Sequence, residues 1–263
     1  MSRWRLVALL IAALAVAGLA LSLALRGEQV AADDKFAPPD ARGWGRVAEF
    51  DYLESVRSGA RPDERLPMVV LIHGLGDEPR ADWLDLVPQD VRARVIMPRG
   101  PMPYHRGYSW FPFEIGEHRS ASLAKTLGPR AQQLSAALQQ LQARRPTRGL
   151  PIVCGFSQGG MLSFAMATRY PERFALALPI SGGLPDALWP TRAPAGAARL
   201  PIRAVHGARD TIVPIEPTRE LTARLRELGY DASLRELPEL GHAISPEVRQ
   251  QVISELSAAI RGR

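Results

Sequence analysis

The sequence contains a single cysteine, Cys154, among 263 residues, so no disulfide can form within the chain. It also lacks cysteine and histidine pairs at the spacing of zinc sites, and it has no glycine-rich phosphate-binding loop. These absences argue against a metal ion or a nucleotide cofactor, and we predict neither. Cys154 ends the apolar run Leu150–Cys154, where a free cysteine is typically a small buried core residue.

A concentrated basic surface is also missing, although the formal net charge is +6 and the pI is about 10.1. Basic residues are scattered and do not form a stripe interleaved with aromatics, which argues against nucleic-acid binding. Attraction to anionic lipid headgroups is one interpretation of the excess charge. We favour an ordinary solvated surface for most of it. The sequence shows no internal repeat and predicts no oligomeric state.

The most informative segment is Gly155–Gly160, whose sequence Gly-Phe-Ser-Gln-Gly-Gly contains the pattern G-x-S-x-G. It follows the apolar run typical of a buried strand and precedes the apolar stretch Met161–Ala167, typical of a helix. This order predicts a nucleophile elbow with Ser157 at the apex of a sharp turn. The helix N-terminus beside the serine favours the negative charge of acyl transfer. The backbone N–H of Gln158 is then one expected oxyanion donor.

A serine nucleophile needs a base and an acid that orients the base. Asp210 follows the apolar segment 201–207, and His242 follows the alternating segment 232–237, so both are expected on loops beyond strand ends. The order Ser157, Asp210, His242 is that of α/β-hydrolases and differs from the orders of chymotrypsin-like and subtilisin-like proteases. We therefore predict these three residues as a catalytic triad.

Other acids and histidines compete for these roles. Asp77 lies before the nucleophile and Asp186 follows the preceding strand, and chain order favours Asp210 over both. His73 and His206 also lie at predicted strand ends. Because a triad needs only one base, we expect a structural role for these two.

Apolar runs and helical patterns alternate from Met68 onward. Continuous apolar runs predict strands buried on both faces, and leucines at helical spacing predict helices between them. The alternation predicts a doubly wound, mostly parallel sheet with helices on both faces and a ligand site beyond the carboxyl ends of the strands. Predicted strands are 68–72, 94–98, 150–154, 175–180, 201–207 and 232–237, with an edge strand in 45–52. Predicted helices are 120–144, with a kink or restart at Gly128–Pro129, then 161–167, 216–228 and 246–260.

Four segments together resemble the carboxylesterase/phospholipase family of α/β-hydrolases, which includes the acyl-protein thioesterases. They are Leu71–Asp77, Gly155–Gly160, His206–Pro214 and Gly241–Ser245. The resemblance runs from about Leu66 to the C-terminus. It implies the α/β-hydrolase fold, the Ser157–Asp210–His242 triad, and the backbone N–H of Leu75 as the second oxyanion donor.

The segment Tyr108–Pro112 resembles the family's Trp–Phe segment near the acyl pocket, which implies that Trp110 and Phe111 line the substrate pocket. Pro112 stands where family members usually have an aspartate, so the local pocket shape is expected to differ. The implied activity is hydrolysis of short- to medium-chain carboxylic esters through an acyl-enzyme. Lysophospholipids and acyl thioesters are alternative substrates. A protein of another class, a membrane-tethered binding protein without activity, is expected to have lost a triad residue, and none is substituted.

The first residues predict a membrane segment. Residues 6–25 carry no charge, and as one apolar helix they would span roughly 30 Å, the thickness of a bilayer core. Arg3 and Arg5 precede them, so the positive-inside rule places the rest of the chain outside the cytosol, which means the periplasm if the source is a Gram-negative bacterium. The alternative is an exported chain that is cleaved near Ala32. We expect a signal-anchor or signal peptide over 1–26, a linker over 27–44 and the hydrolase domain over 45–263.

Overall fold

The structure is a computed structural model that describes residues 35–112 and 119–262. The chain divides into two units, Met1–Phe36 and Ala37–Arg263, and the second is described below. Ala37 exchanges two backbone hydrogen bonds with Arg46, so this residue of the predicted linker is already part of the larger unit. The boundaries expected at residues 27 and 45 stay predictions.

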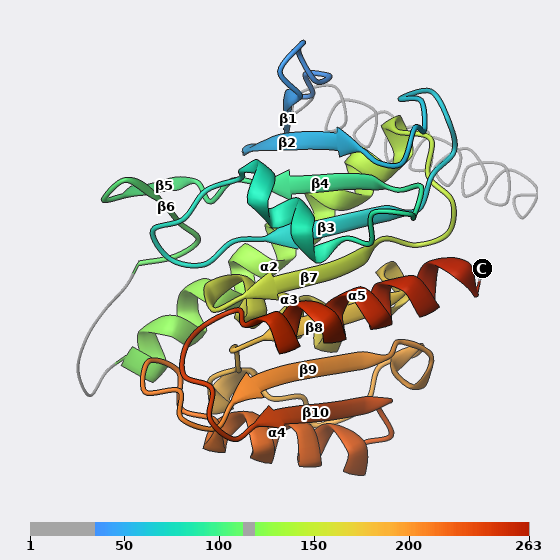
Figure 1. The fold of residues 1–263 in the computed structure, drawn as a ribbon. Coiled ribbons are helices and arrows are strands. Elements are labelled where there is room, and N and C mark those ends of the chain that lie inside the picture. Colours follow the sequence, from blue (N-terminus) through green and yellow to red (C-terminus); the bar gives the residue numbers. More distant parts are fainter. Residues whose placement is uncertain (1–34, 113–118, 263) are drawn as a thin grey trace, which may run out of the picture. The chain divides into compact units, whose positions relative to one another are not determined.

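An eight-stranded sheet crosses this unit in the order β1-β2-β4-β3-β7-β8-β9-β10 (Figure 1). The six strands from β4 to β10 in that order are parallel neighbours, whereas β1 and β2 form an antiparallel hairpin at one edge. The prediction of a mostly parallel sheet is confirmed. The strands are β1 (Trp44–Val47), β2 (Phe50–Val56), β3 (Met68–Ile72), β4 (Arg94–Pro98), β7 (Ile152–Phe156), β8 (Leu176–Ile180), β9 (Ile202–Gly207) and β10 (Ala232–Leu237).

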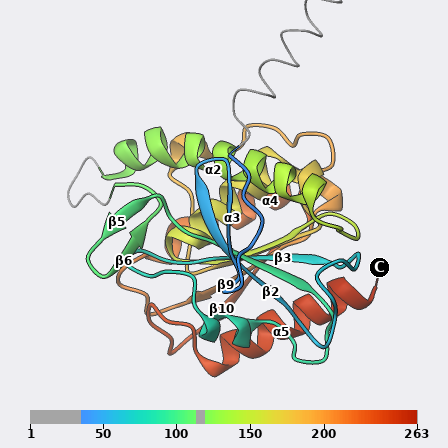
Figure 2. The same ribbon diagram turned by 90° about the horizontal axis from the view of Figure 1, so that it is seen from above.

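Helices cover both faces of the sheet, as the doubly wound prediction requires. Figure 2 shows α2, α3 and α4 over one face and α5 over the other. The α-helices are α2 (Arg119–Arg144), α3 (Gln158–Arg169), α4 (Glu216–Glu227) and α5 (Pro246–Arg261), and the 3₁₀ helices are η1 (Ala81–Leu86), η2 (Pro171–Arg173), η3 (Asp186–Leu188) and η4 (Ala197–Arg199).

Local sequence explains where these helices begin and end. Ser245 caps the N-terminus of α5 by accepting a hydrogen bond from the N–H of Val248, and Pro246 occupies the first turn. Gly229, with φ of 88°, follows α4 in the left-handed region, as expected of a helix stop. Helix α2 runs through Gly128–Pro129 as one element, so the expected restart there is wrong.

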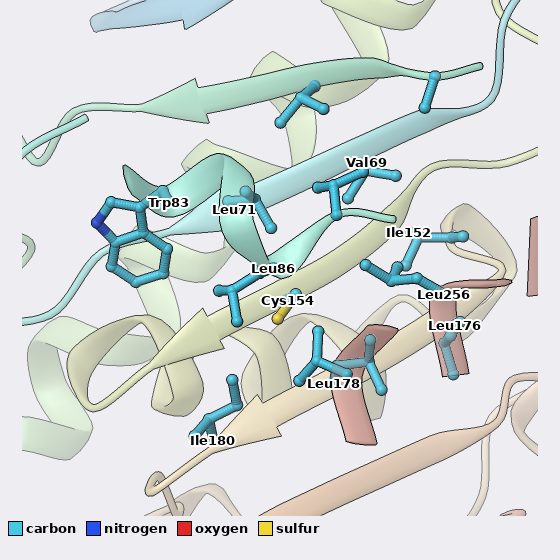
Figure 3. Close-up of a cluster of buried hydrophobic side chains, with 14 of the residues drawn as sticks. Val69, Leu71, Trp83, Leu86, Ile152, Cys154, Leu176, Leu178, Ile180 and Leu256 are labelled. Carbon is cyan, nitrogen blue, oxygen red and sulfur yellow. The ribbon is translucent and has the colours of Figure 1, made fainter. Parts of the chain in front are cut away.

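The core between the sheet and α5 explains why the strand sequences are continuous apolar runs. Alternate residues of β3, β7 and β8 point to one face and pack against η1 and α5 (Figure 3). The intervening residues, such as Val70 and Val153, are buried as well. Cys154 belongs to this core, as predicted, and burial raises the pKa of its thiol to about 12. The labelled members are Val69, Leu71, Trp83, Leu86, Ile152, Cys154, Leu176, Leu178, Ile180 and Leu256.

Two short features differ from the sequence-based expectation. The edge strand expected in 45–52 is a hairpin, because the chain reverses at Ala48, whose φ is 51°, and β1 then pairs with β2. A second hairpin, β5 (Met102–Tyr104) with β6 (Gly107–Ser109), was not predicted. It leads directly into Trp110 and Phe111 and so positions these two residues beside the candidate site.

The prediction of a membrane-anchored protein is corrected. Within residues 35–112 and 119–262, no helix combines the length and the apolar character needed to cross a bilayer. The N-terminal apolar helix over residues 6–25, on which the anchor and its outward-facing location depended, lies outside the described residues, as does Ala32. We therefore retain neither the anchor nor the location inferred from it.

Candidate active site

Ser157 lies at the connection between β7 and α3 with backbone angles φ 56° and ψ −116°. A non-glycine residue in this region is strained, and such strain is typical of functional turns. The turn is held by the Ser157 N–H, which donates to the carbonyl oxygen of Ile180 at 2.9 Å, and by the Met161 N–H, which donates to the Ser157 carbonyl oxygen at 2.9 Å. A Cβ on Gly155 would overlap with the carbonyl oxygen of Gly159. The G-x-S-x-G pattern therefore reflects close backbone packing at this turn.

His242 links the serine to an acid. Its Nδ1 lies 2.7 Å from Oδ2 of Asp210, and its Nε2 lies 3.0 Å from Oγ of Ser157. An ionised carboxylate only accepts hydrogen bonds, so Nδ1 donates to Asp210, and in the neutral ring Nε2 is then the acceptor for the Ser157 hydroxyl. The structure thus brings together the three residues that the sequence placed on separate strand-end loops.

The Asp210 carboxylate is buried and well supplied with donors. Burial alone would raise its pKa, but the hydrogen bonds from His242 and from the N–H groups of Val213 and Ile212 outweigh burial and lower the pKa below its usual value. His206 lies behind it, with Nε2 3.4 Å from Oδ2 of Asp210 and 2.8 Å from the carbonyl oxygen of Val213. His206 therefore supports the loop that carries the acid, in line with the expected structural role.

Neither alternative acid contacts His242, although Asp77 also lines the cavity beside Ser157. Asp77 accepts hydrogen bonds from Arg80 and from the indole N–H of Trp83, the latter at 3.2 Å. Asp186 is exposed at the start of η3. Only Asp210, of these three acids, contacts His242.

Both expected oxyanion donors border a cavity beside Ser157. Within the part of the chain that the structure describes, the N–H groups of Leu75 and Gln158 donate to no other residue. Gln158 is the first residue of α3, so its N–H also lies at the positive end of a helix dipole. Two unpaired amides beside a hydroxyl are the arrangement that stabilises an oxyanion.

The Trp110 side chain occupies a different place from the one expected. It is fully buried and does not line the cavity, whereas Phe111 does. The indole N–H of Trp110 donates to the carbonyl oxygen of His73 at 2.9 Å, and its backbone N–H donates to Oε1 of Gln158 at 2.9 Å. Trp110 therefore connects the loop after β3 to the start of α3. Sequence reasoning missed this role because it took both aromatics as pocket residues.

The cavity has a volume of about 330 Å³, within the usual range for small-ligand sites. Ser157, Gln158 and His242 lie on its wall, and most of the remaining wall is apolar. Ile212, on the loop after Asp210, is 52% exposed at this site. Such a cavity suits a short apolar chain attached to a polar reacting group. The apolar lining consists of Leu75, Phe111, Pro112, Leu123, Phe156, Met161, Ile212 and Val213.

No set of three or more His, Cys, Asp or Glu side chains in residues 35–112 and 119–262 is arranged to hold a metal ion. The polar groups that meet beside Ser157 are the His242 imidazole, which contacts the Asp210 carboxylate, and the backbone amides that border the cavity.

Comparison with known proteins gives a family match that covers most of the chain. Residues 53–260 match the family described as phospholipase/carboxylesterase. A rice protein (Oryza sativa subsp. japonica) described as a probable inactive carboxylesterase is 29% identical over 194 residues, 68% of this chain and 79% of the relative. Carboxylesterase SOBER1 of Arabidopsis thaliana is 24% identical over 212 residues, 74% of this chain and 91% of the relative. The crystal structure of esterase PE8 has a TM-score of 0.65 at 24% identity, over 78% of this chain and 99% of that one.

Proposed function

Because the chain belongs to the phospholipase/carboxylesterase family of α/β-hydrolases, we propose that it hydrolyses carboxylic esters through an acyl-enzyme formed on Ser157. The observation that carries this proposal is the pair of hydrogen bonds made by His242, whose Nδ1 donates to Asp210 and whose Nε2 accepts from the Ser157 hydroxyl. The rice relative described as probably inactive makes activity a matter for experiment. In this chain all three side chains are present and within hydrogen-bond distance.

The proposed reaction begins when Oγ of Ser157 attacks the ester carbonyl carbon and Nε2 of His242 takes its proton. Asp210 stabilises the imidazolium that forms. The tetrahedral oxyanion accepts hydrogen bonds from the N–H groups of Leu75 and Gln158. The carbon–oxygen bond to the leaving group then breaks, and the departing alcohol takes the proton from His242. Water repeats these steps on the acyl-enzyme and releases the carboxylic acid.

The size and lining of the cavity support short- to medium-chain acyl groups. An apolar chain gains affinity for each methylene that it buries, until the cavity is full. The triad does not distinguish an alcohol from a thiol leaving group, so a thioester with the same acyl chain is the appropriate second substrate to assay.

The first test is covalent labelling of the full chain by a fluorophosphonate, which traps activated serines. Labelling should disappear in Ser157→Ala and persist in Ser122→Ala, a second serine that lines the same cavity. Undiminished labelling of Ser157→Ala would show that another serine is the nucleophile.

The second test is a series of p-nitrophenyl esters from acetate to palmitate, with the octanoyl thioester assayed in parallel. We expect kcat/KM to be highest between butyrate and octanoate and to fall for palmitate. Absence of hydrolysis across esters and thioesters, together with absence of labelling, would favour the binding-protein alternative.

A further inference from the structure

His73 directly follows β3 and is buried with 2% of its surface exposed. Its Nε2 lies 2.9 Å from the backbone nitrogen of Gly100. A backbone N–H only donates, so Nε2 must be the acceptor and cannot carry a proton. Burial lowers the pKa of His73 to about 4, which keeps the ring neutral at ordinary pH. The single ring proton is therefore on Nδ1.

That proton points at one particular carbonyl group. Nδ1 of His73 lies 2.7 Å from the carbonyl oxygen of Gly74. The Gly74 carbonyl and the Leu75 N–H belong to the same peptide group. In a trans, planar peptide these two bonds point in opposite directions. No cis peptide occurs among the described residues, so a ring that holds the Gly74 oxygen also fixes the direction of the Leu75 N–H.

This peptide needs such a restraint because Gly74 forms one side of it and Gly76 follows Leu75 on the other. Gly74 has no Cβ, and Gly76 has φ of 74°, a region open mainly to glycine. Hydrogen bonds hold the backbone on either side of it. The Gly76 N–H donates to the carbonyl oxygen of Tyr108, and the His73 carbonyl oxygen accepts from the indole N–H of Trp110. Between these two hydrogen-bonded positions, the hydrogen bond from the His73 ring to the Gly74 carbonyl oxygen orients the Gly74–Leu75 peptide.

We propose that His73 is a positioning residue of the oxyanion hole, which aims the Leu75 N–H into the cavity by holding the carbonyl oxygen of the same peptide. A hydrogen bond to the carbonyl also polarises the amide, which makes its N–H a stronger donor. This proposal rests on the proposed function, since it assigns His73 a part in stabilising the oxyanion. It differs from a packing role because it depends on which ring nitrogen carries the proton.

The chain allows a matched pair of substitutions. In His73→Asn the side-chain amide N–H₂ stands near the position of Nδ1 and still donates to Gly74. In His73→Gln the amide is one bond longer, so its oxygen stands near the position of Nε2, accepts from Gly100 and leaves Gly74 without a donor. Both substitutions place an uncharged amide in the same buried site, so their stabilities, measured by urea denaturation, provide the control for folding.

We expect His73→Gln to lower kcat by about a hundredfold, the usual loss when one oxyanion donor is removed, with KM nearly unchanged. His73→Asn should retain kcat within about tenfold of the wild type, since the hydrogen bond to Gly74 remains. Equal losses in the two variants, or a loss expressed mainly in KM, would overturn the proposal.

A readout without substrate separates this proposal from the proposed function. In ¹⁵N NMR spectra of the wild type, the His73 ring should show protonated Nδ1 and unprotonated Nε2. The Leu75 amide resonance should shift in His73→Gln and stay close to the wild-type position in His73→Asn. A ring protonated on Nε2 would overturn the positioning role even if neither variant folds. A wild type with the expected spectra but no esterase activity would instead contradict the proposed function.

Discussion

Gly159 packs so closely against β3 that a Cβ at this position would overlap with the carbonyl oxygen of Ile72. Ile72 is the last residue of β3, and the loop with Leu75, the proposed oxyanion donor, follows it. The close approach of α3 to the end of this strand therefore sets the distance between the nucleophile and the oxyanion loop. The second glycine of G-x-S-x-G is thus explained by contact with a neighbouring strand as well as by the turn itself.

Gly159→Ala is accordingly predicted to destabilise the protein by about 3 kcal/mol or more, because a backbone atom cannot move aside as a side chain can. The matched control is Gly229→Ala, where φ is 88° but nothing lies within 4 Å of the added Cβ. That variant should lose only about 1–2 kcal/mol, the cost of a left-handed residue. Urea denaturation of both variants measures the difference, and equal losses would mean that the contact with Ile72 costs no more than a left-handed residue.

Asp210→Asn should keep the fold and lower kcat by about 10³–10⁴-fold. The amide can present its N–H₂ to His242 and so favour the wrong tautomer of the imidazole. Asp77→Asn and Asp186→Asn are the comparison variants, and both should retain most activity because neither contacts His242. The measurement is kcat on p-nitrophenyl butyrate, with circular dichroism as the check on folding. A greater loss in Asp186→Asn than in Asp210→Asn would reassign the acid.

Trp110 and Phe111 are adjacent in sequence, but substitution of each should change a different property of the protein. Phe111→Ala enlarges the cavity, so we expect the preferred p-nitrophenyl ester to shift toward a longer acyl chain. Trp110→Phe removes the N–H that donates to His73 and leaves the cavity lining intact. It should lower kcat without changing chain-length preference, and it should cost about 1–3 kcal/mol of stability because a buried carbonyl loses its donor. A changed chain-length preference in Trp110→Phe would show that the indole does shape the cavity.

The proximity of the three proposed triad residues was predictable because each follows a local pattern. Ser157 lies in a motif between an apolar run and a helical stretch, and Asp210 and His242 each follow a recognisable strand. Parallel strands end at one edge of a sheet, so residue order along the chain was enough to bring these loops together. The positions of the strands in the sheet did not have to be known.

The role of Trp110 could not be predicted in the same way. Its ring lies 6.0 Å from that of Phe50 and 5.1 Å from that of His73, so its burial depends on segments distant in sequence. The hairpin β5–β6 that carries the chain into this position has strands of only three residues, too short to show a periodicity. Likewise, the ring proton of His73 is fixed by Gly100, a contact that no sequence pattern marks.

A buried ion cluster away from the site likewise depends on contacts between segments that are distant in sequence. Arg94 begins an apolar strand and is fully buried, and its guanidinium pairs with Glu54 on β2. Arg145, the residue after α2, donates to the same carboxylate oxygen at 2.6 Å. The three residues belong to separate elements, and only the antiparallel register of β2 with β4 brings Glu54 near Arg94.

Arg94→Met is predicted to destabilise the protein by about 3 kcal/mol, because it removes the fully buried partner of Glu54 and leaves only Arg145 paired with that carboxylate. The control is Arg42→Met, which breaks the exposed pair with Asp40 and should change stability by less than about 1 kcal/mol. Urea denaturation at neutral pH measures both. Similar values for the two variants would mean that the Arg94–Glu54 pair contributes no more than a surface pair.

The last prediction concerns pH and follows from the neutral His73. Its pKa is about 4 in the folded protein and about 6.5 in the unfolded chain, so between these values the unfolded state binds more protons. Stability should therefore fall as pH decreases from about 6.5 to 4, by about 3 kcal/mol from this residue, and His73→Asn should lack this contribution.

Burial also lowers the pKa of His206, so His73→Asn should retain a smaller dependence of the same sign. The measurement is urea denaturation of wild type and His73→Asn at intervals from pH 7.5 to 4. As pH decreases across this window, the free energy of unfolding should fall more for the wild type than for His73→Asn. A difference that is constant with pH would show that His73 titrates alike in the folded and unfolded states, contrary to a ring held neutral by burial.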